Sequence, residues 1–408
     1  MPKPQTKVIN IVAPDKGIYQ NLTKHLIKDE AWSEGNNIRF GQGYIEKIIG
    51  WKKFIANQLD GELMAIDNYY KFNGDSYLIF ITTKRVYTYD DVNGLIDITG
   101  GTLLKGTLDH PVITENAQNC FVFTNGIDRV KYWDGVAATI ADFPGLNNCV
   151  GPGGAGVNVT KCKALLYFKN FLLLLGTTET IGGSSADYPQ RVRWSQIGDI
   201  FNWKNDTANT QAGYGDLSDG VDWGQALRPL NDFVVAYKER SIHVLRYIGG
   251  DLVWDKNPAI IGTGLISPKA LIDLGDEHVF IGPDNIYSFD LREVKIAGDA
   301  ISKEFFDKQL DPGKVQSIIT AYIEEVPEAW FVFTSTTSPD GFPDKAIVYN
   351  VDTKAWAWRD APMTAFGYYN AKDENTWESD TEAIWDRMDI EWDSSRALAN
   401  APINLCGD

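Results

Sequence analysis

The residues of this chain that could do chemistry are widely spaced, apart from a large set of carboxylates. The four histidines show none of the HxH, HExxH or HxxE spacings of metal-binding histidines: they are His25, His110, His243 and His278. The four cysteines form no CxxC pair, so neither a zinc site nor a redox motif is predicted: they are Cys120, Cys149, Cys162 and Cys406. We expect reduced thiols in a cytosolic setting, with a pairing of Cys149 and Cys162 left open.

Carboxylates are the remaining groups that could take part in catalysis or metal binding, and two interpretations of them are open. A pair of carboxylates in a central funnel would suit a propeller enzyme that hydrolyses glycans. Acidic residues are also the ordinary occupants of β-turns, and this chain has 55 Asp and Glu residues. The loose calcium-loop pattern at 216–222 lacks the closing Glu of an EF-hand. We predict no catalytic residue, no metal and no cofactor; the carboxylates considered are Asp216, Asp219, Asp222, Asp251, Asp284, Asp290 and Asp344.

Composition restricts the class of protein further. The chain has 408 residues, and its formal net charge is 38 − 55 = −17, which makes it a poor candidate for wrapping nucleic acid. Its apolar runs are far shorter than the ~20 residues of a membrane-spanning helix. The apolar patch at 8–12 is too short for a signal peptide, so we expect neither export by that route nor membrane insertion. A high content of aromatic residues and 37 glycines favour an all-β chain with many turns.

A pair of β-rich runs joined by a turn recurs along the chain. The turns centre near residues 84, 126, 183, 239, 284 and 340, about 42 to 57 residues apart, which is typical of propeller blades. The sequence therefore predicts an all-β, β-propeller-like ring of about six degenerate strand-pair blades with few short helices, although five to seven blades fit. The paired runs are 77–82 with 85–90, 121–124 with 128–135, 164–175 with 191–195, 233–237 with 242–247, 278–281 with 286–290, and 330–333 with 346–351.

Three regions are predicted along the chain: an N-terminal arm at 1–36, a propeller core at 37–370, and a C-terminal segment at 371–408 rich in Trp and acidic residues. A further strand pair at 37–40 and 45–54 is expected to pair with a late strand. We expect a helix at 301–310 with Ser302 as its N-cap. The stretch 177–190 is expected to be a mobile loop, and no closing strand is evident at 405–408.

Three stretches of the chain together resemble the tail nozzle or tail hub proteins of short-tailed bacteriophages, which include packaged-DNA stabilisation or head-completion proteins. The first contains an Asn-x-Arg-Phe element at 37–40, a glycine turn at Gly43 and a Lys-x-x-Gly element at 47–50. The other two are 191–195 with 199–203, and 262–268 with 280–287. The order and spacing of these stretches, over roughly residues 20–395, carry the resemblance.

The resemblance implies a structural virion protein that is not an enzyme. Such a protein is present as six copies below the portal and its adaptor, extends the DNA channel, retains the packaged genome and lets it pass on ejection without sequence-specific binding. It also implies contact with tail fibres or a tail tip, and assembly in the host cytoplasm before incorporation into the virion tail. The alternatives left open are a propeller lectin or glycan-acting enzyme, and a phage receptor-binding scaffold.

Basic residues in an acidic chain are the candidates for contact with neighbouring proteins. Lys47, Lys52 and Lys53 are candidates for an adaptor contact, and Lys238 and Arg240 lie in a charged turn suited to subunit contacts. The stretches 177–190 and 334–345 are candidates for subunit contacts or a channel gate. For each of them, an ordinary solvated strand face or loop tip is the competing interpretation.

Overall fold

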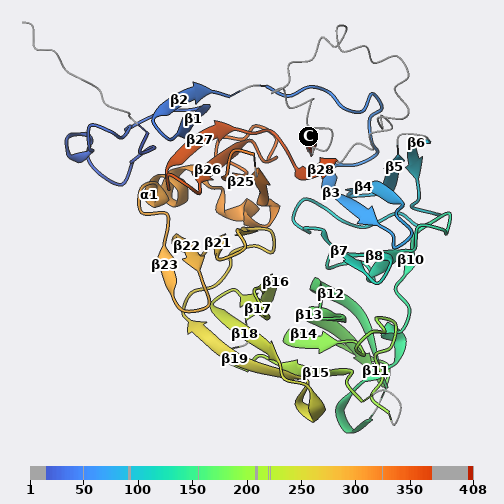
Figure 1. Ribbon diagram of the computed structural model, residues 1–408. Helices are drawn as coiled ribbons and strands as arrows, with labels where there is room; N and C mark the ends of the chain where they lie inside the picture. Colours follow the sequence, from blue (N-terminus) through green and yellow to red (C-terminus); the bar gives the residue numbers. More distant parts are fainter. Residues whose placement is uncertain are drawn as a thin grey trace, which may run out of the picture. The chain divides into compact units, whose positions relative to one another are not determined.

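Figure 1 shows a computed structural model of the chain, which describes residues 15–48, 50–90, 93–154, 156–206, 210–218, 220, 222–323, 325–369 and 403–407. The protein is mostly β-structure and is a six-bladed β-propeller with few short helices, as the sequence predicts. By its contacts the chain divides into two compact units. The first comprises Met1–Lys53, Tyr188–Val192 and Gly215–Met363; the second comprises Phe54–Asp187, Arg193–Tyr214 and Thr364–Asp408.

Each blade is an antiparallel sheet whose strands follow one another in sequence. The first is β3 (Leu63–Tyr70), β4 (Ser76–Thr82), β5 (Val86–Asp90) and β6 (Gly94–Asp97). The second is β7 (Ile113–Ala117), β8 (Cys120–Thr124), β9 (Lys131–Trp133) and β10 (Ala141–Asp142). The third has five strands: β11 (Cys149–Val150), β12 (Gly156–Phe168), β13 (Phe171–Ile181), β14 (Ser184–Trp194) and β15 (Gly213–Asp216).

The remaining three blades have four strands each. The fourth is β16 (Gly224–Leu230), β17 (Phe233–Lys238), β18 (Ser241–Tyr247) and β19 (Trp254–Ile261). The fifth is β20 (Leu271–Asp273), β21 (His278–Ile281), β22 (Ile286–Phe289) and β23 (Val294–Ile296). The sixth is β24 (Ile319–Ile323), β25 (Glu328–Phe333), β26 (Lys345–Asn350) and β27 (Trp356–Asp360).

Two further two-stranded sheets and a few helical turns complete the described structure. The sheets are β1 (Ile38–Gly41) with β2 (Tyr44–Lys47), and β28 (Ala365–Tyr369) with β29 (Ile403–Gly407). The helical turns are η1 (Lys24–Leu26), η2 (Leu146–Asn148), η3 (Pro152–Gly154), η4 (Gly250–Leu252), α1 (Ser302–Glu304), η5 (Phe305–Gln309) and η6 (Pro312–Ser317).

Five of the six predicted strand pairs are present. In the third, the predicted run 164–175 is divided between β12 and β13 by a turn at residues 169 and 170, and it is β13 that neighbours β14. Three further local expectations are wrong. The stretch 177–190 belongs to strands β13 and β14, because its polar residues lie on an extended hairpin whose base is apolar. Residues 403–407 form β29, which pairs with β28 in register. The helix predicted at 301–310 is present at residues 302–309, as α1 followed by one π turn, but Ser302 is its first residue and not its N-cap, and the Ser302 hydroxyl accepts a hydrogen bond from Asn21.

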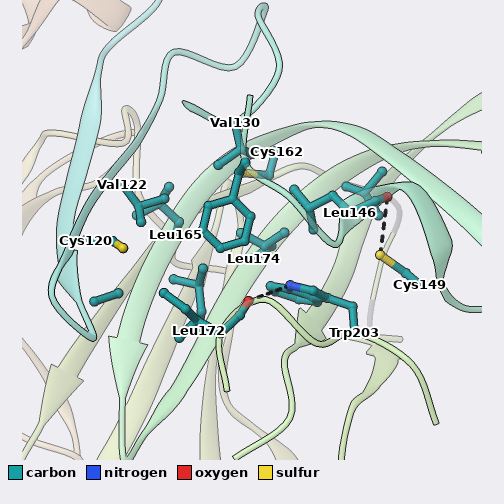
Figure 2. Packing of buried hydrophobic residues seen from close by; sticks show 14 of the residues in the cluster. Cys120, Val122, Val130, Leu146, Cys149, Cys162, Leu165, Leu172, Leu174 and Trp203 are labelled. Atoms are coloured by element: carbon teal, nitrogen blue, oxygen red, sulfur yellow. Dashed lines mark hydrogen bonds between the residues drawn. The ribbon is translucent and has the colours of Figure 1, made fainter. Parts of the chain in front are cut away.

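An apolar cluster in the second unit buries three of the cysteines (Figure 2). Cys120, Cys149 and Cys162 are free thiols, so the pairing of Cys149 with Cys162 is not made. Burial raises the pKa of both Cys149 and Cys162 to about 12. Trp203 fills the same cluster and donates its indole N–H to the Ile200 carbonyl at 2.8 Å. These thiols act as small apolar side chains in the core.

The β28–β29 sheet packs on β3 through two glycines. A Cβ placed on Gly367 would lie 2.6 Å from the Ile66 carbonyl oxygen, and one on Gly407 would lie 2.1 Å from a Leu63 methyl group. The close approach buries Ala365, Tyr369 and Leu405 with the apolar side chains of β3 and β4. The C-terminal strand is therefore part of the core of its unit.

Replacing Gly367 by Ala should destabilise the protein by about 1–3 kcal/mol, because the new methyl group meets backbone that cannot rotate away. Gly101→Ala is the matched control, since nothing lies within 4 Å of a Cβ at that position. Urea unfolding followed by tryptophan fluorescence measures both changes. Equal midpoints for the two variants would contradict the close packing of β28 on β3.

Candidate interaction site on the N-terminal clasp

The N-terminal residues 15–48 and 50–53, here called the clasp, lie along the outer strand of the sixth blade. The Ile18 amide donates to the Trp356 carbonyl at 2.9 Å, and the Asn37 amide donates to the Trp358 carbonyl at 2.9 Å. Gly17 has φ of +79°, and a Cβ there would lie 2.7 Å from the Trp356 amide nitrogen. The clasp is thus held against β27 by backbone contacts at two points.

The Asn-x-Arg-Phe element provides the side chains of this attachment. Asn36 and Asn37 both donate to Oδ2 of Asp360, at 2.9 and 2.7 Å, and the Asp360 amide donates back to Oδ1 of Asn37 at 3.0 Å. The predicted pair at 37–40 and 45–54 is present as β1 and the shorter β2, which pair with each other. It contacts the late strand β27, but β1 and β2 form a two-stranded sheet of their own, so the expected pairing with a late strand is not made in the described residues.

A buried carboxylate joins the clasp to the blade. Oε1 of Glu328 accepts from Nε of Arg39 at 3.0 Å and from Nη2 of Arg359 at 2.7 Å, and Arg39 also pairs with Glu46 at 2.8 Å. The Glu328 side chain is 2% exposed and that of Arg359 is 1% exposed. Burial lowers the pKa of Arg359 to about 10, while Glu328 opposes that fall, so the guanidinium stays charged at neutral pH. The Arg359 guanidinium also lies 4.4 Å over the Trp330 ring.

The surface end of this arrangement carries three of the basic residues predicted to contact a partner. Trp51 packs edge-on against Trp330 with ring centroids 6.3 Å apart, and it remains 51% exposed. Lys52 and Lys53 follow it and are exposed, and Lys47 is exposed on β2. Lys47, Trp51, Lys52 and Lys53 are called the basic strip below.

The other two predicted contact residues lie apart from the clasp and differ from each other. Lys238 is fully buried: its ammonium group pairs with Asp222 at 3.0 Å and donates to the Gly220 carbonyl at 3.0 Å. It therefore holds the loop before β16 to the end of β17 and presents no charge to solvent in this chain. Arg240 is exposed in the following turn. The run Lys238–Arg240 is thus divided between core and surface.

The carboxylates considered for catalysis are engaged in pairs and turns in the described part of the chain. Asp216 binds Arg191 with both oxygens, and Asp222 binds Lys238. The remaining three serve turns: Asp284 accepts from Tyr287, Asp290 caps two backbone amides, and Asp344 closes the 334–345 loop on Ser335. Asp219 and the side chain of Asp251 lie outside the described residues. Within the described ranges no group of three metal-binding side chains is assembled.

His278 is a buried histidine held by two hydrogen bonds. Its Nε2 lies 2.9 Å from the Pro229 carbonyl, which can only accept, so this nitrogen carries the proton and Nδ1 accepts from the Tyr237 hydroxyl at 2.8 Å. Burial lowers the pKa of His278 to about 4, and Asp273 opposes the shift. The ring is a neutral structural link between β17 and β21.

Sequence reasoning missed the buried ion pairs. Besides Glu328, the carboxylate of Glu179 is fully buried and binds Arg193, whose Nη1 also donates to the Val150 carbonyl at 2.7 Å. A charged residue within an apolar strand, such as Arg193 beside Trp194, is the signal that could have found them.

No protein-family model and no curated protein matches the chain. Among solved structures, the computationally designed protein Ika8 is 12% identical with a TM-score of 0.40, over 76% of this chain and 91% of that protein. The computationally designed protein Ika4 is 15% identical with a TM-score of 0.30, over 49% of this chain and 100% of that protein. In the described residues, none of the helices is long and apolar enough to cross a membrane.

Replacing Glu328 by Gln should lower the free energy of unfolding by about 3–5 kcal/mol, because two arginines lose their buried counter-charge. Glu325→Gln is the control, as Glu325 is exposed in the turn before β25. Urea midpoints at neutral pH compare the two variants. A loss no larger for Glu328→Gln than for the control would rule out the shared carboxylate as the anchor of the clasp.

The buried neutral ring of His278 should make stability depend on pH between 7 and 5. Its pKa is about 4 when folded and about 6.5 when unfolded, so the unfolded chain takes up the proton first and stability falls as pH falls. The expected loss from this group is about 2 kcal/mol over that interval, levelling off near the folded pKa. Urea midpoints of the native chain and His278→Gln at both pH values measure it. The same pH slope in both would refute the assignment.

Proposed function

We propose that this protein is a structural subunit of a short-tailed phage tail, a nozzle or hub that extends the DNA channel below the portal and its adaptor. The observation that carries the proposal is the position of the residues on which the resemblance to tail nozzle proteins is based. Asn37 and Arg39 attach the clasp to the sixth blade, and the same attachment leaves the basic strip exposed. A segment built this way suits a fixed docking face better than a mobile arm.

The charge of the chain supports the same role. Six copies would carry 6 × −17 = −102 formal charges at neutral pH. An acidic channel wall repels phosphate, so DNA can slide without adhering while it is retained and then ejected. Against that background, a local group of three exposed lysines is suited to an acidic face on the adaptor.

The proposed contact set is narrower than the sequence alone predicts. Lys47, Lys52 and Lys53 remain candidates for the adaptor contact, and Arg240 for a contact between subunits. Lys238 is no longer a candidate, because its ammonium group is buried and forms an ion pair with Asp222. The stretch 177–190 forms the hairpin of β13 and β14 and remains a candidate for a subunit contact.

The test is to locate the protein in phage particles. A gold label on an affinity tag, imaged in particles of the source phage, should lie on the stub below the portal with six-fold symmetry in end-on views. Label at a fibre tip would replace the proposal by receptor binding. Absence from particles would reject the virion role and make glycan hydrolysis the next activity to assay. Untagged particles control for non-specific labelling.

A further inference from the structure

Part of the clasp leaves the blades and returns to them as a closed loop. The Tyr19 amide donates to the Trp32 carbonyl at 2.8 Å, so the two ends of the loop 20–31 lie together. The start of the loop is fixed to the connection that follows the fifth blade, because the Asn21 amide donates to the Ala300 carbonyl at 3.1 Å. A compact surface loop with joined ends is an Ω-loop, a kind of loop that is frequently functional.

The tip of this loop, residues 22–28, carries apolar side chains that its own chain leaves exposed. Leu22 is 47% exposed and Leu26 is 61% exposed. In Figure 1 the loop is the dark blue segment that extends away from β1 and α1. A lone exposed leucine is ordinary on a protein surface, but two at the tip of one anchored loop favour an interaction site.

The charge of the tip is opposite to that of the rest of the chain. The tip contains two lysines and no carboxylate, so its formal charge is +2, while all other residues together carry −17 − 2 = −19. The carboxylates of the loop, Asp29 and Glu30, come after the tip. Lys24 pairs with Glu34 at 2.6 Å, but the two side chains are 74% and 71% exposed, so this pair holds the lysine only weakly. An apolar, basic tip is suited to an acidic surface, and this chain is itself acidic.

One end of the fifth blade provides such a surface in the first unit. Its two hairpin turns, 273–277 and 290–293, lie at the same end because successive strands of this sheet are antiparallel. Together the turns hold five carboxylates and one arginine, a net charge of 1 − 5 = −4, of which Lys295 offsets one. Leu274 and Leu291, one in each turn, are partly exposed. The acidic end of the blade therefore offers both the charge and the apolar contacts that the tip lacks.

The loop and the acidic end of the blade lie beyond opposite ends of β23. The turn 290–293 precedes this strand, whereas Asp299 and Ala300, which bind Asn21 at the start of the loop, follow it. The two surfaces of one chain are therefore separate patches. A contact between them joins two copies through a heterologous interface, which repeats from copy to copy.

We propose that the tip 22–28 docks on the acidic end of the fifth blade of a second copy of this chain. The leucines of the tip pack on Leu274 and Leu291, and its lysines face the carboxylates of the two turns. A contact between two tips, or between two acidic ends, would instead bring like charges together. Head-to-tail contacts of this kind generate a ring where the rotation between copies closes.

The contact does not depend on the proposed tail function. If that function holds, the tip joins neighbouring copies in the tail, while the basic strip faces the adaptor. The tests below use the isolated chain in solution, and the gold label uses particles. The failure of one idea is therefore distinguishable from the failure of the other.

Carbodiimide cross-linking of an equal mixture of ¹⁴N- and ¹⁵N-labelled full chain tests the contact, since this reagent joins lysine amines to carboxylates that touch. Mass spectrometry should find mixed-isotope products that join a lysine of the tip to a carboxylate of 273–277 or 290–293. The pair Lys308–Glu304, at 2.6 Å within one chain, is the control and should give single-isotope products. Recovery of the control without the mixed product overturns the proposal. Tip products of a single isotope assign the contact to one chain and also overturn it.

An exchange of charges gives a second measurement. Sedimentation equilibrium of the Lys24→Glu/Lys28→Glu variant should show self-association weakened by about tenfold or more, because carboxylates then face carboxylates. Adding Asp276→Lys/Glu277→Lys to the same chain restores opposite charges and should return the association constant to within about threefold of the native value. A fourfold variant that is folded by circular dichroism and still fails to associate contradicts the docking, as does a native chain that stays monomeric.

The matched control for the loss of association is Lys105→Glu/Lys204→Glu, which makes the same change of net charge at exposed sites of the second unit. Its association constant should stay within about twofold of the native value, because neither lysine lies on the tip or on the acidic end of the blade. Equal weakening in the control and the tip variant would show an effect of net charge alone and would overturn the proposal.

Discussion

The carboxylate of Glu328 is the constraint on which the first unit depends. It begins β25, is almost fully buried, and binds one arginine from the clasp and one from β27. A buried carboxylate with two guanidinium partners is costly to desolvate and still more costly to leave unpaired, so such a network fixes one arrangement more than it adds stability. The position of Arg39, and with it the β1–β2 hairpin, follows from where Glu328 lies on the blade.

The sequence predicts the middle of each blade far better than its margins. Strands such as β4 and β17 are largely buried, so most of their residues are apolar on both faces. They give the β-rich runs from which the sequence predicts the blades. The inner strand β7 reads ITENA, and the outer strand β10 is only two residues long, so neither carries a strong pattern. For the third blade the sequence predicts a strand pair with a loop, because the long hairpin is polar where it leaves the core.

The sequence predicts which types of residue form the candidate site, but it does not predict which of them are buried. Lys52 and Lys238 look alike in sequence, since each lies in a charged run beside apolar residues. Only the fold separates them: the loop that precedes β16 supplies a carboxylate and a carbonyl to Lys238, while Lys52 is exposed among the described residues. A charged residue within an apolar strand can indicate a buried ion pair, but it does not indicate the partner when that residue is far away in sequence, as Arg39 is from Glu328.

The N-terminal clasp and the C-terminal strand β29 attach to the blades in different ways. The clasp attaches to the outer strand of a blade through polar side chains, whereas β29 enters an apolar core through glycine contacts. Asn37 and Arg39 are partly exposed, and their side chains are engaged in this attachment through Asp360 and Glu328. In this chain the Asn-x-Arg-Phe element attaches a segment to a blade. A partner that bound this part of the chain would meet chiefly the residues that the attachment leaves exposed, among them Lys52 and Lys53.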